Sequence, residues 1–181
     1  MKKKSVLLWV LFLFLIDQIV KIVINRYFID LRFSIIPPLL YFQPTFNLHY
    51  SWINGLFNLG MGFWTHMLIF SFVTLFIVLL YDFMKTISGN DKLLNIAFVF
   101  VFAGMMSSFV GTIIWNGCLD YIYLKPLFVF DLKDLYVTTF FLPLSFLYQF
   151  KNREHLSSFT HKDIVPHFKK RYVSLFIKRE D

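Results

Sequence analysis

The stretch FVFDLKDLYV, residues 128–137, places two aspartates and a lysine inside an almost wholly apolar run. The chain continues as TTFFLPLSFLYQF to residue 150. The run 130–150 is therefore long enough to cross a bilayer, which takes about 20 residues as a helix. Asp131, Lys133 and Asp134 would lie at the lip of this helix, where ionisable groups are costly and so indicate a structural or chemical role.

The composition extends this apolar character to the whole chain. Its 181 residues are 57% hydrophobic and 21% aromatic, and only 16% of them are charged. A soluble domain of this length could not cover so much apolar surface with polar groups. We therefore expect an all-α membrane protein. The single cysteine, Cys118, excludes an internal disulfide framework and a multi-cysteine metal site.

Three further segments are long and apolar enough to span a membrane, at about residues 5–25, 61–84 and 93–115. The first follows MKKK and could be a signal peptide, but no small-residue cleavage site comes after it. Together with 130–150, these segments predict a four-helix transmembrane bundle over residues 1–150. A basic tail, 151–181, follows it, and a loop region lies between the first two helices.

The positions of lysine and arginine predict the orientation of this bundle. Most of them lie near the N-terminus, in the break between the second and third spans, and in the tail. The positive-inside rule then makes both termini cytoplasmic and turns residues 26–60 and 116–129 outward. The net charge of +7 is thus placed to contact anionic lipids rather than nucleic acid.

Polar residues interrupt the first span at LIDQIVKIV, where Asp17 and Lys21 are four residues apart. This spacing puts them on one helix face, where they can pair. A buried ion pair that holds one helix against another is the simpler interpretation of these two residues. They would then support a site without taking part in its chemistry.

Asp120 lies in NGCLDYIYLKPLF, a segment too polar to span a membrane and too apolar for an ordinary surface loop. Asp134 follows it by fourteen residues, and both are expected at the outer interface. Two acids in low dielectric do not both ionise readily, which is an arrangement for activating a water. The same acids could instead bind a cation. Asp131 also fits a helix N-cap, with Asp134 at the third helical position.

At these residues the chain resembles signal peptidase II, the lipoprotein signal peptidase family of bacteria. Residues 17–21, DQIVK, are similar to the family's Asp-Gln-x-x-Lys. CLDYI at 118–122 resembles Val-Val-Asp-Phe-Ile, and FDLKD at 130–134 resembles Phe-Asn-x-Ala-Asp. More loosely, the loop TFNLHYSWING is similar to Asn-x-Gly-Ala-Ala-Phe, with Asn47 as the substrate-contacting asparagine. The tail lies outside the resemblance.

The chain also departs from the family. Alignment back from Asp120 puts Ser108, Gly111 and Thr112 where the family's Gly-Asn-x-x-Asp-Arg has asparagine, aspartate and arginine. Asp131 replaces the asparagine of Phe-Asn and adds a third carboxylate. The segment between the two catalytic aspartates is shorter than is usual in the family.

The resemblance implies a membrane aspartic endopeptidase of the bacterial inner membrane that acts on a diacylglyceryl-modified prolipoprotein. Asp120 and Asp134 would be catalytic, Asn47 and Asp131 would contact the substrate, and Asp17 and Lys21 would support the site. No cofactor or metal is expected, since the five histidines are scattered on both sides of the membrane.

Two other functions remain open at the level of sequence. The chain could be a catalytically silent paralogue that binds lipidated proteins, which the missing asparagine and arginine favour. It could also be a small ion-coupled carrier that uses the acids. Carriers usually show internal repeats and broken helices at mid-membrane, and the two halves of this chain show no convincing repeat.

The orientation can be tested with reporter fusions. We expect fusions after Lys151 and within residues 85–92 to be cytoplasmic, and fusions near Asn47 and Leu124 to be exported. Paired phosphatase and fluorescent-protein reporters would distinguish the two sides. An exported fusion after Lys151 would contradict the whole arrangement.

Overall fold

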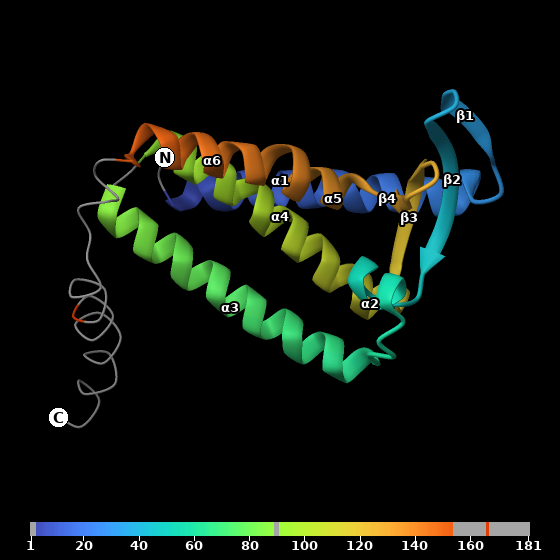
Figure 1. Ribbon diagram of the computed structural model, residues 1–181, viewed down its shortest axis with the longest axis horizontal. Helices are drawn as coiled ribbons and strands as arrows, with labels where there is room; N and C mark the ends of the chain where they lie inside the picture. The colour runs from blue at the N-terminus through green and yellow to red at the C-terminus, as the bar shows by residue number, and fades with distance from the viewer. Residues whose placement is uncertain (1–2, 89–90, 154–165, 167–181) are drawn as a thin grey trace. The chain divides into compact units, whose positions relative to one another are not determined.

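The computed structural model describes residues 3–88, 91–153 and 166 (Figure 1). Most of the predicted tail, 151–181, lies outside the described residues. The described residues up to Ser145 belong to one compact unit, and those from Phe146 belong to a second. The first unit contains the sheet and the candidate site.

Three helical segments of the described part are long and apolar enough to cross a membrane, which confirms three of the expected spans. They are α1 (Lys3–Val23) with the π-helical η1 (Ile24–Phe28), then α3 (Phe63–Ser88), and α4 (Lys92–Trp115). Half of the apolar window of α4 is buried, whereas none of the window of α3 is. The side chains of α4 therefore form the centre of the unit, whereas most of those of α3 are exposed or half-buried.

The predicted fourth span is a helical run of three contiguous parts. They are α5 (Leu132–Leu135), the π-helical η2 (Tyr136–Phe141) and α6 (Leu142–Lys151). Pro143 has no backbone N–H to donate, and just before it the Leu142 N–H donates to the Val137 carbonyl, five residues back. This run is not among the three apolar helices, so the fourth crossing stays a prediction.

The core joins α1, α4 and η2. Val6 and Val10 of α1 pack with Val99 and Ala103 of α4 and with Tyr136 of η2. The Tyr136 hydroxyl also donates to the Leu13 carbonyl at 3.0 Å. The small residues of α4 allow the close approach, because a Cβ added at Gly104 would lie 3.2 Å from the Lys133 carbonyl oxygen.

The expectation of an all-α fold is wrong, because four strands form an antiparallel sheet at one end of the helices (Figure 1). The order is β1 (Phe33–Ile36), β2 (Leu40–Asn47), β3 (Cys118–Leu124) and β4 (Phe128–Phe130). The expected outward loops, 26–60 and 116–129, supply all of it except Phe130, which was expected to begin the fourth helix, and the first loop also contains the short helix α2 (Trp52–Phe57). Aromatic and β-branched residues fill these strands and suit a half-buried pleated surface.

The pairing of β2 with β3 positions the first candidate acid. Asp120 lies opposite Thr45, and Cys118 lies opposite Asn47. Side chains alternate along a strand, so Leu119 and Tyr121 share a face and pack against Ile24 of η1. Asp120 and Cys118 are therefore on the other face, which is turned toward the start of α5.

The turn between α4 and β3 is the tightest point of this arrangement. A Cβ added at Gly117 would lie 2.5 Å from the Asn47 carbonyl oxygen, which belongs to the backbone of β2. We expect Gly117→Ala to separate the ends of β2 and β3 and to lower the free energy of unfolding by about 1–3 kcal/mol. Thermal unfolding in detergent measures this. Gly62→Ala, where nothing lies within 4 Å of the added Cβ, is the matched control; equal effects of the two substitutions would contradict the prediction.

Candidate active site

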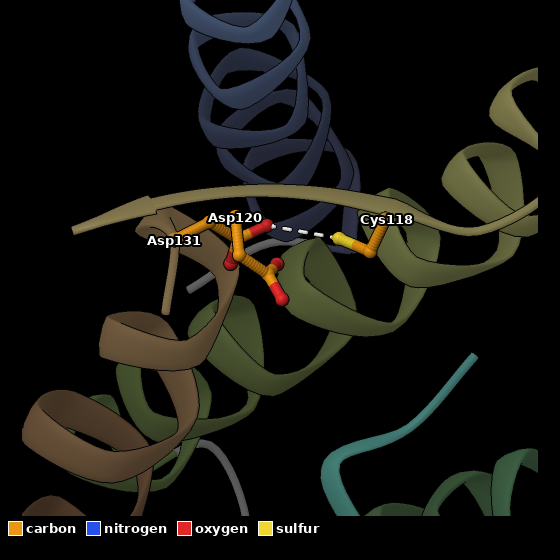
Figure 2. Close-up of side chains that lie close together, drawn as sticks. All are labelled: Cys118, Asp120 and Asp131. Atoms are coloured by element: carbon orange, nitrogen blue, oxygen red, sulfur yellow. Dashed lines mark hydrogen bonds between the residues drawn. The ribbon is translucent and has the colours of Figure 1, made fainter. Parts of the chain in front are cut away.

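Charged side chains from three separate segments meet where the sheet contacts the helices. Asp17 and Lys21 come from α1, Asp120 comes from β3, and Asp131, Lys133 and Asp134 come from the start of α5. Figure 2 shows Asp120 and Asp131 close together beside Cys118. The predicted site residues are therefore brought into one cluster, with Asn47 at its edge.

The start of α5 is a capping box, as the N-cap alternative for Asp131 predicted. The Asp131 carboxylate accepts from the Asp134 backbone N–H at 3.2 Å, and the Asp134 carboxylate accepts from the Asp131 N–H at 3.2 Å. These bonds satisfy backbone donors that a helix start leaves free. Asp134 is thereby fixed one turn into the helix, with its side chain 43% exposed.

The predicted pair of Asp17 and Lys21 is present and fully buried, with 2.8 Å between Oδ2 and Nζ. Lys21 also contacts Asp131, at 2.7 Å from Oδ2. Gln18 donates to Asp17 at 3.0 Å. The pair thus connects α1 to the cap of α5, which is the supporting geometry expected of it.

Lys133 is the centre of the cluster. Its Nζ lies 2.9 Å from Asp131 Oδ2, 3.4 Å from Asp120 Oδ1 and 3.5 Å from Asp134 Oδ1. The nearest oxygens of Asp120 and Asp134 can therefore be no further apart than the sum of the last two distances. One ammonium group contacts both candidate catalytic carboxylates.

The groups around Asp120 have opposing effects on the pKa of its carboxyl group. Burial raises the pKa of its carboxyl, and the negative charge of Asp131 acts in the same direction. The Lys133 ammonium lowers this pKa, as do hydrogen bonds from Cys118 and Asn47. The Asn47 side-chain amide lies 3.4 Å from Asp120 Oδ2. The predicted substrate-contacting asparagine is thus next to the first acid.

A cavity of about 780 Å³ opens onto these groups. Its polar lining includes Asn47, Asp120, Lys133 and Asp134. Apolar side chains of α3 and β4 also line it, namely Ile69, Phe70, Val73, Phe128 and Val129. Asp131 is fully buried against the two lysines, so a contact between Asp131 and substrate stays a prediction.

The donor set could in principle hold a metal ion, since ligand atoms of Cys118, Asp120 and Asp131 lie within 4.8 Å of one another. However, Asp131 Oδ2 already contacts the ammonium groups of Lys21 and Lys133. A metal ion would have to displace one of them or share the same oxygen with both. The cluster therefore fits ammonium counter-charges better than a metal centre.

The sequence placed Lys133 at the lip of the last helix without predicting its contacts, and it did not single out Asn54 or His66. The role of Lys133 was hidden because a lysine beside a helix start usually faces solvent. Asn54 bonds the His49 and Met61 carbonyls and the Met61 N–H, at 2.7–3.0 Å, and so closes the loop beside the cavity. His66 of α3 lines the cavity with its Nε2 buried and without a hydrogen-bond partner among the described residues. Nothing in the sequence around either residue pointed to these positions.

The buried cluster predicts a large stability effect at Lys21. We expect Lys21→Met to lower the free energy of unfolding by about 3–5 kcal/mol, because it leaves Asp17 and part of the Asp131 charge buried without a partner. Thermal unfolding in detergent measures the loss. Lys4→Met removes the same charge from an exposed position and is the control. A loss no larger than that of the control would contradict the ion-pair account.

Comparison with known proteins shows the family of this chain and supports its fold. The sequence model of signal peptidase (SPase) II matches residues 9–150. Two solved structures, both described as a bacterial membrane enzyme determined by the in meso method, are similar in fold. The first, at 2.3 Å resolution, has a TM-score of 0.64 and 19% identity, and the match covers 84% of this chain and 91% of that one. The second, at 1.9 Å, has a TM-score of 0.66 and 19% identity, with 83% and 96% covered.

The comparison with curated proteins gives no match. The two structures support the fold, and the match over 9–150 covers most of the chain, including every residue of the charged cluster. The motifs resembling Asp-Gln-x-x-Lys, Val-Val-Asp-Phe-Ile and Phe-Asn-x-Ala-Asp thus meet in one charged cluster, and residues of the last two line the cavity. The chain belongs to the signal peptidase II family of membrane aspartic endopeptidases.

Proposed function

We propose that this protein removes signal peptides from diacylglyceryl-modified prolipoproteins, with Asp120 and Asp134 activating the attacking water. It would cut before the lipid-modified cysteine and leave the signal peptide in the membrane. Its place would be the bacterial inner membrane, with both termini cytoplasmic and the site at the outer face.

One observation carries this proposal: Asp120 and Asp134 contact the same ammonium group, that of Lys133, at the edge of one cavity. The two acids come from separate segments, one expected in an outward loop and the other in the fourth helix. An aspartic endopeptidase needs two carboxyl groups close enough to serve one water and one scissile carbonyl. The contact of both carboxylates with the Lys133 ammonium group supports this role. The roles of general base and general acid belong to Asp120 and Asp134 together, because coupled acids titrate as a unit.

The cavity has the character that a lipidated substrate requires. Its apolar side, formed partly by α3, suits a signal-peptide helix or an acyl chain, whereas Asn47 and the acids suit the peptide backbone. The largely exposed α3 faces lipid, so a substrate in the outer leaflet could reach the cavity laterally. Asn47 would orient the backbone, since its amide can both donate and accept.

A silent paralogue is the competing function, and two observations favour it. Lys133 contacts both acids, at a position where the motif Phe-Asn-x-Ala-Asp has alanine. In addition, Ser108, Gly111 and Thr112 on α4 supply neither the carboxylate nor the guanidinium of the family motif. Such a protein would bind lipidated precursors without cutting them.

The test is cleavage of a lipidated prolipoprotein in a bacterial host that lacks its own lipoprotein signal peptidase. We expect the wild-type chain to process the precursor, and Asp120→Asn and Asp134→Asn each to abolish processing. The double variant should be no worse than either single one, because residues that act as a unit are not additive.

Asp30→Asn, in an exposed position outside the cluster, is the matched control and should process normally. Each variant is checked for membrane insertion and thermal stability. Near wild-type processing by either single variant would refute the two-aspartate mechanism. If the wild-type chain binds the precursor and never cuts it, the silent paralogue replaces the proposed function.

A further inference from the structure

Lys133 gives the site a charge balance different from that of two aspartates alone. Two neighbouring carboxyl groups in low dielectric ordinarily share one proton, because both cannot ionise comfortably. Here an ammonium group, only 13% exposed, lies 3.4 Å from one acid and 3.5 Å from the other. It offsets one negative charge, as a shared proton would.

The position of Lys133 is firmly determined. Its Nζ lies 2.9 Å from Asp131 Oδ2, and Asp131 is itself fully buried and held by Lys21 at 2.7 Å. The Lys133 carbonyl also lies against α4 at Gly104. Lys133 lines the cavity beside Asp120 and Asp134, so its Nζ hydrogens can reach an atom bound there.

We propose that Lys133 is a third catalytic residue. In a site of two aspartates alone, the proton shared by the carboxyl groups offsets one charge and is donated in the reaction; here Lys133 does both. This inference rests on the proposed function and adds to it the identity of the proton donor. Asp120 and Asp134 are then both ionised in mildly alkaline solution, and Lys133 faces the carbonyl oxygen of the scissile peptide bond.

The reaction balances with these groups alone. One carboxylate of the pair takes a proton from water as the water oxygen bonds to the peptide carbonyl carbon, and the Lys133 ammonium gives a proton to the carbonyl oxygen. A neutral tetrahedral intermediate results, beside a neutral amine and a neutral carboxyl group. The carboxyl group then protonates the leaving nitrogen as the C–N bond breaks, and a hydroxyl proton of the intermediate returns to Lys133. The net change is addition of one water across the peptide bond.

The surrounding groups set the expected pH dependence. Lys133 faces Asp131 and Asp134 on its own helix, Cys118 and Asp120 on β3, and the Lys21 charge on α1; His66 of α3 lines the same cavity. The carboxylates favour the ammonium form, so the proton donor persists into alkaline solution. Without Lys133, the pair must bind a proton to act, and activity is lost as rising pH removes that proton.

The experiment compares pH profiles of kcat/KM for the purified full-length protein with a diacylglyceryl-modified prolipoprotein peptide in detergent. We expect Lys133→Met to lose about 100- to 1,000-fold in mildly alkaline buffer, the scale of losing one electrostatic stabiliser of a transition state. Part of the loss should be recovered in mildly acidic buffer, where the pair regains a proton. Lys133→Arg keeps the charge, but its guanidinium does not release a proton, so it should lose turnover throughout the range.

Lys125→Met, in the exposed turn between β3 and β4, removes the same charge and should leave the profile unchanged. Asp131→Asn with Lys133→Ala restores Phe-Asn-x-Ala-Asp and should be active with a more acidic optimum. A Lys133→Met profile of unchanged shape would overturn the proposal and leave the two-aspartate function standing. Higher activity of Lys133→Met at neutral pH would also overturn it, since Lys133 would then be an inhibitory contact.

Infrared spectroscopy gives a readout that does not need turnover. On titration from mildly acidic to alkaline buffer, the carbonyl band of a neutral carboxyl group from Asp120 or Asp134, as judged against the two Asn variants, should disappear at a lower pH in the wild-type protein than in Lys133→Met. Lys133→Arg should behave as the wild type does. A band that disappears at the same pH in the wild type and in Lys133→Met would overturn the charge assignment, whether or not the precursor is cut.

Discussion

The Asp131 carboxylate between two lysines is the contact on which the rest of the site depends. Lys21 approaches it from α1 at 2.7 Å and Lys133 from α5 at 2.9 Å, in a place without solvent. Moving such charges out of water costs several kcal/mol per ion, and only close, well-satisfied geometry offsets this cost. The three groups therefore fix α1 and the start of α5 against each other and so determine where Asp134 lies.

The sheet fixes the position of Asp120, as the ion pairs fix that of Asp134. Helices alone would leave Asp120 on a free connection, but the pairing of β2 with β3 fixes it opposite Thr45 and next to Asn47. Gly117 permits this because the backbone of β2 passes where a side chain would lie. The acids are thus presented by a rigid end of the bundle, beside a cavity that α3 lines with apolar groups.

The departures from the family motifs move one acid and one base from α4 to the start of α5. The chain lacks an acid and a base expected on α4, at Gly111 and Thr112, and it carries an additional acid and base on α5, at Asp131 and Lys133. The sum of charges is unchanged, but a counter-charge now contacts the two acids directly. This shift is consistent with a family member whose electrostatics are rebuilt, and it leads to the proton-donor role proposed for Lys133.

The sequence by itself determined the membrane character, three of the apolar helices and the family, and it picked out the acids that meet in the charged cluster, because hydrophobic length and short motifs are local properties. The i, i+4 spacing likewise predicted the pair of Asp17 and Lys21, and cap preferences predicted the capping box at Asp131. Only the tertiary structure decided that the outward segments form a sheet and that Lys133 and Lys21 share Asp131. Strand partners some seventy residues apart, such as Asn47 and Cys118, and contacts between helices are set by packing of the whole chain, which no local pattern records.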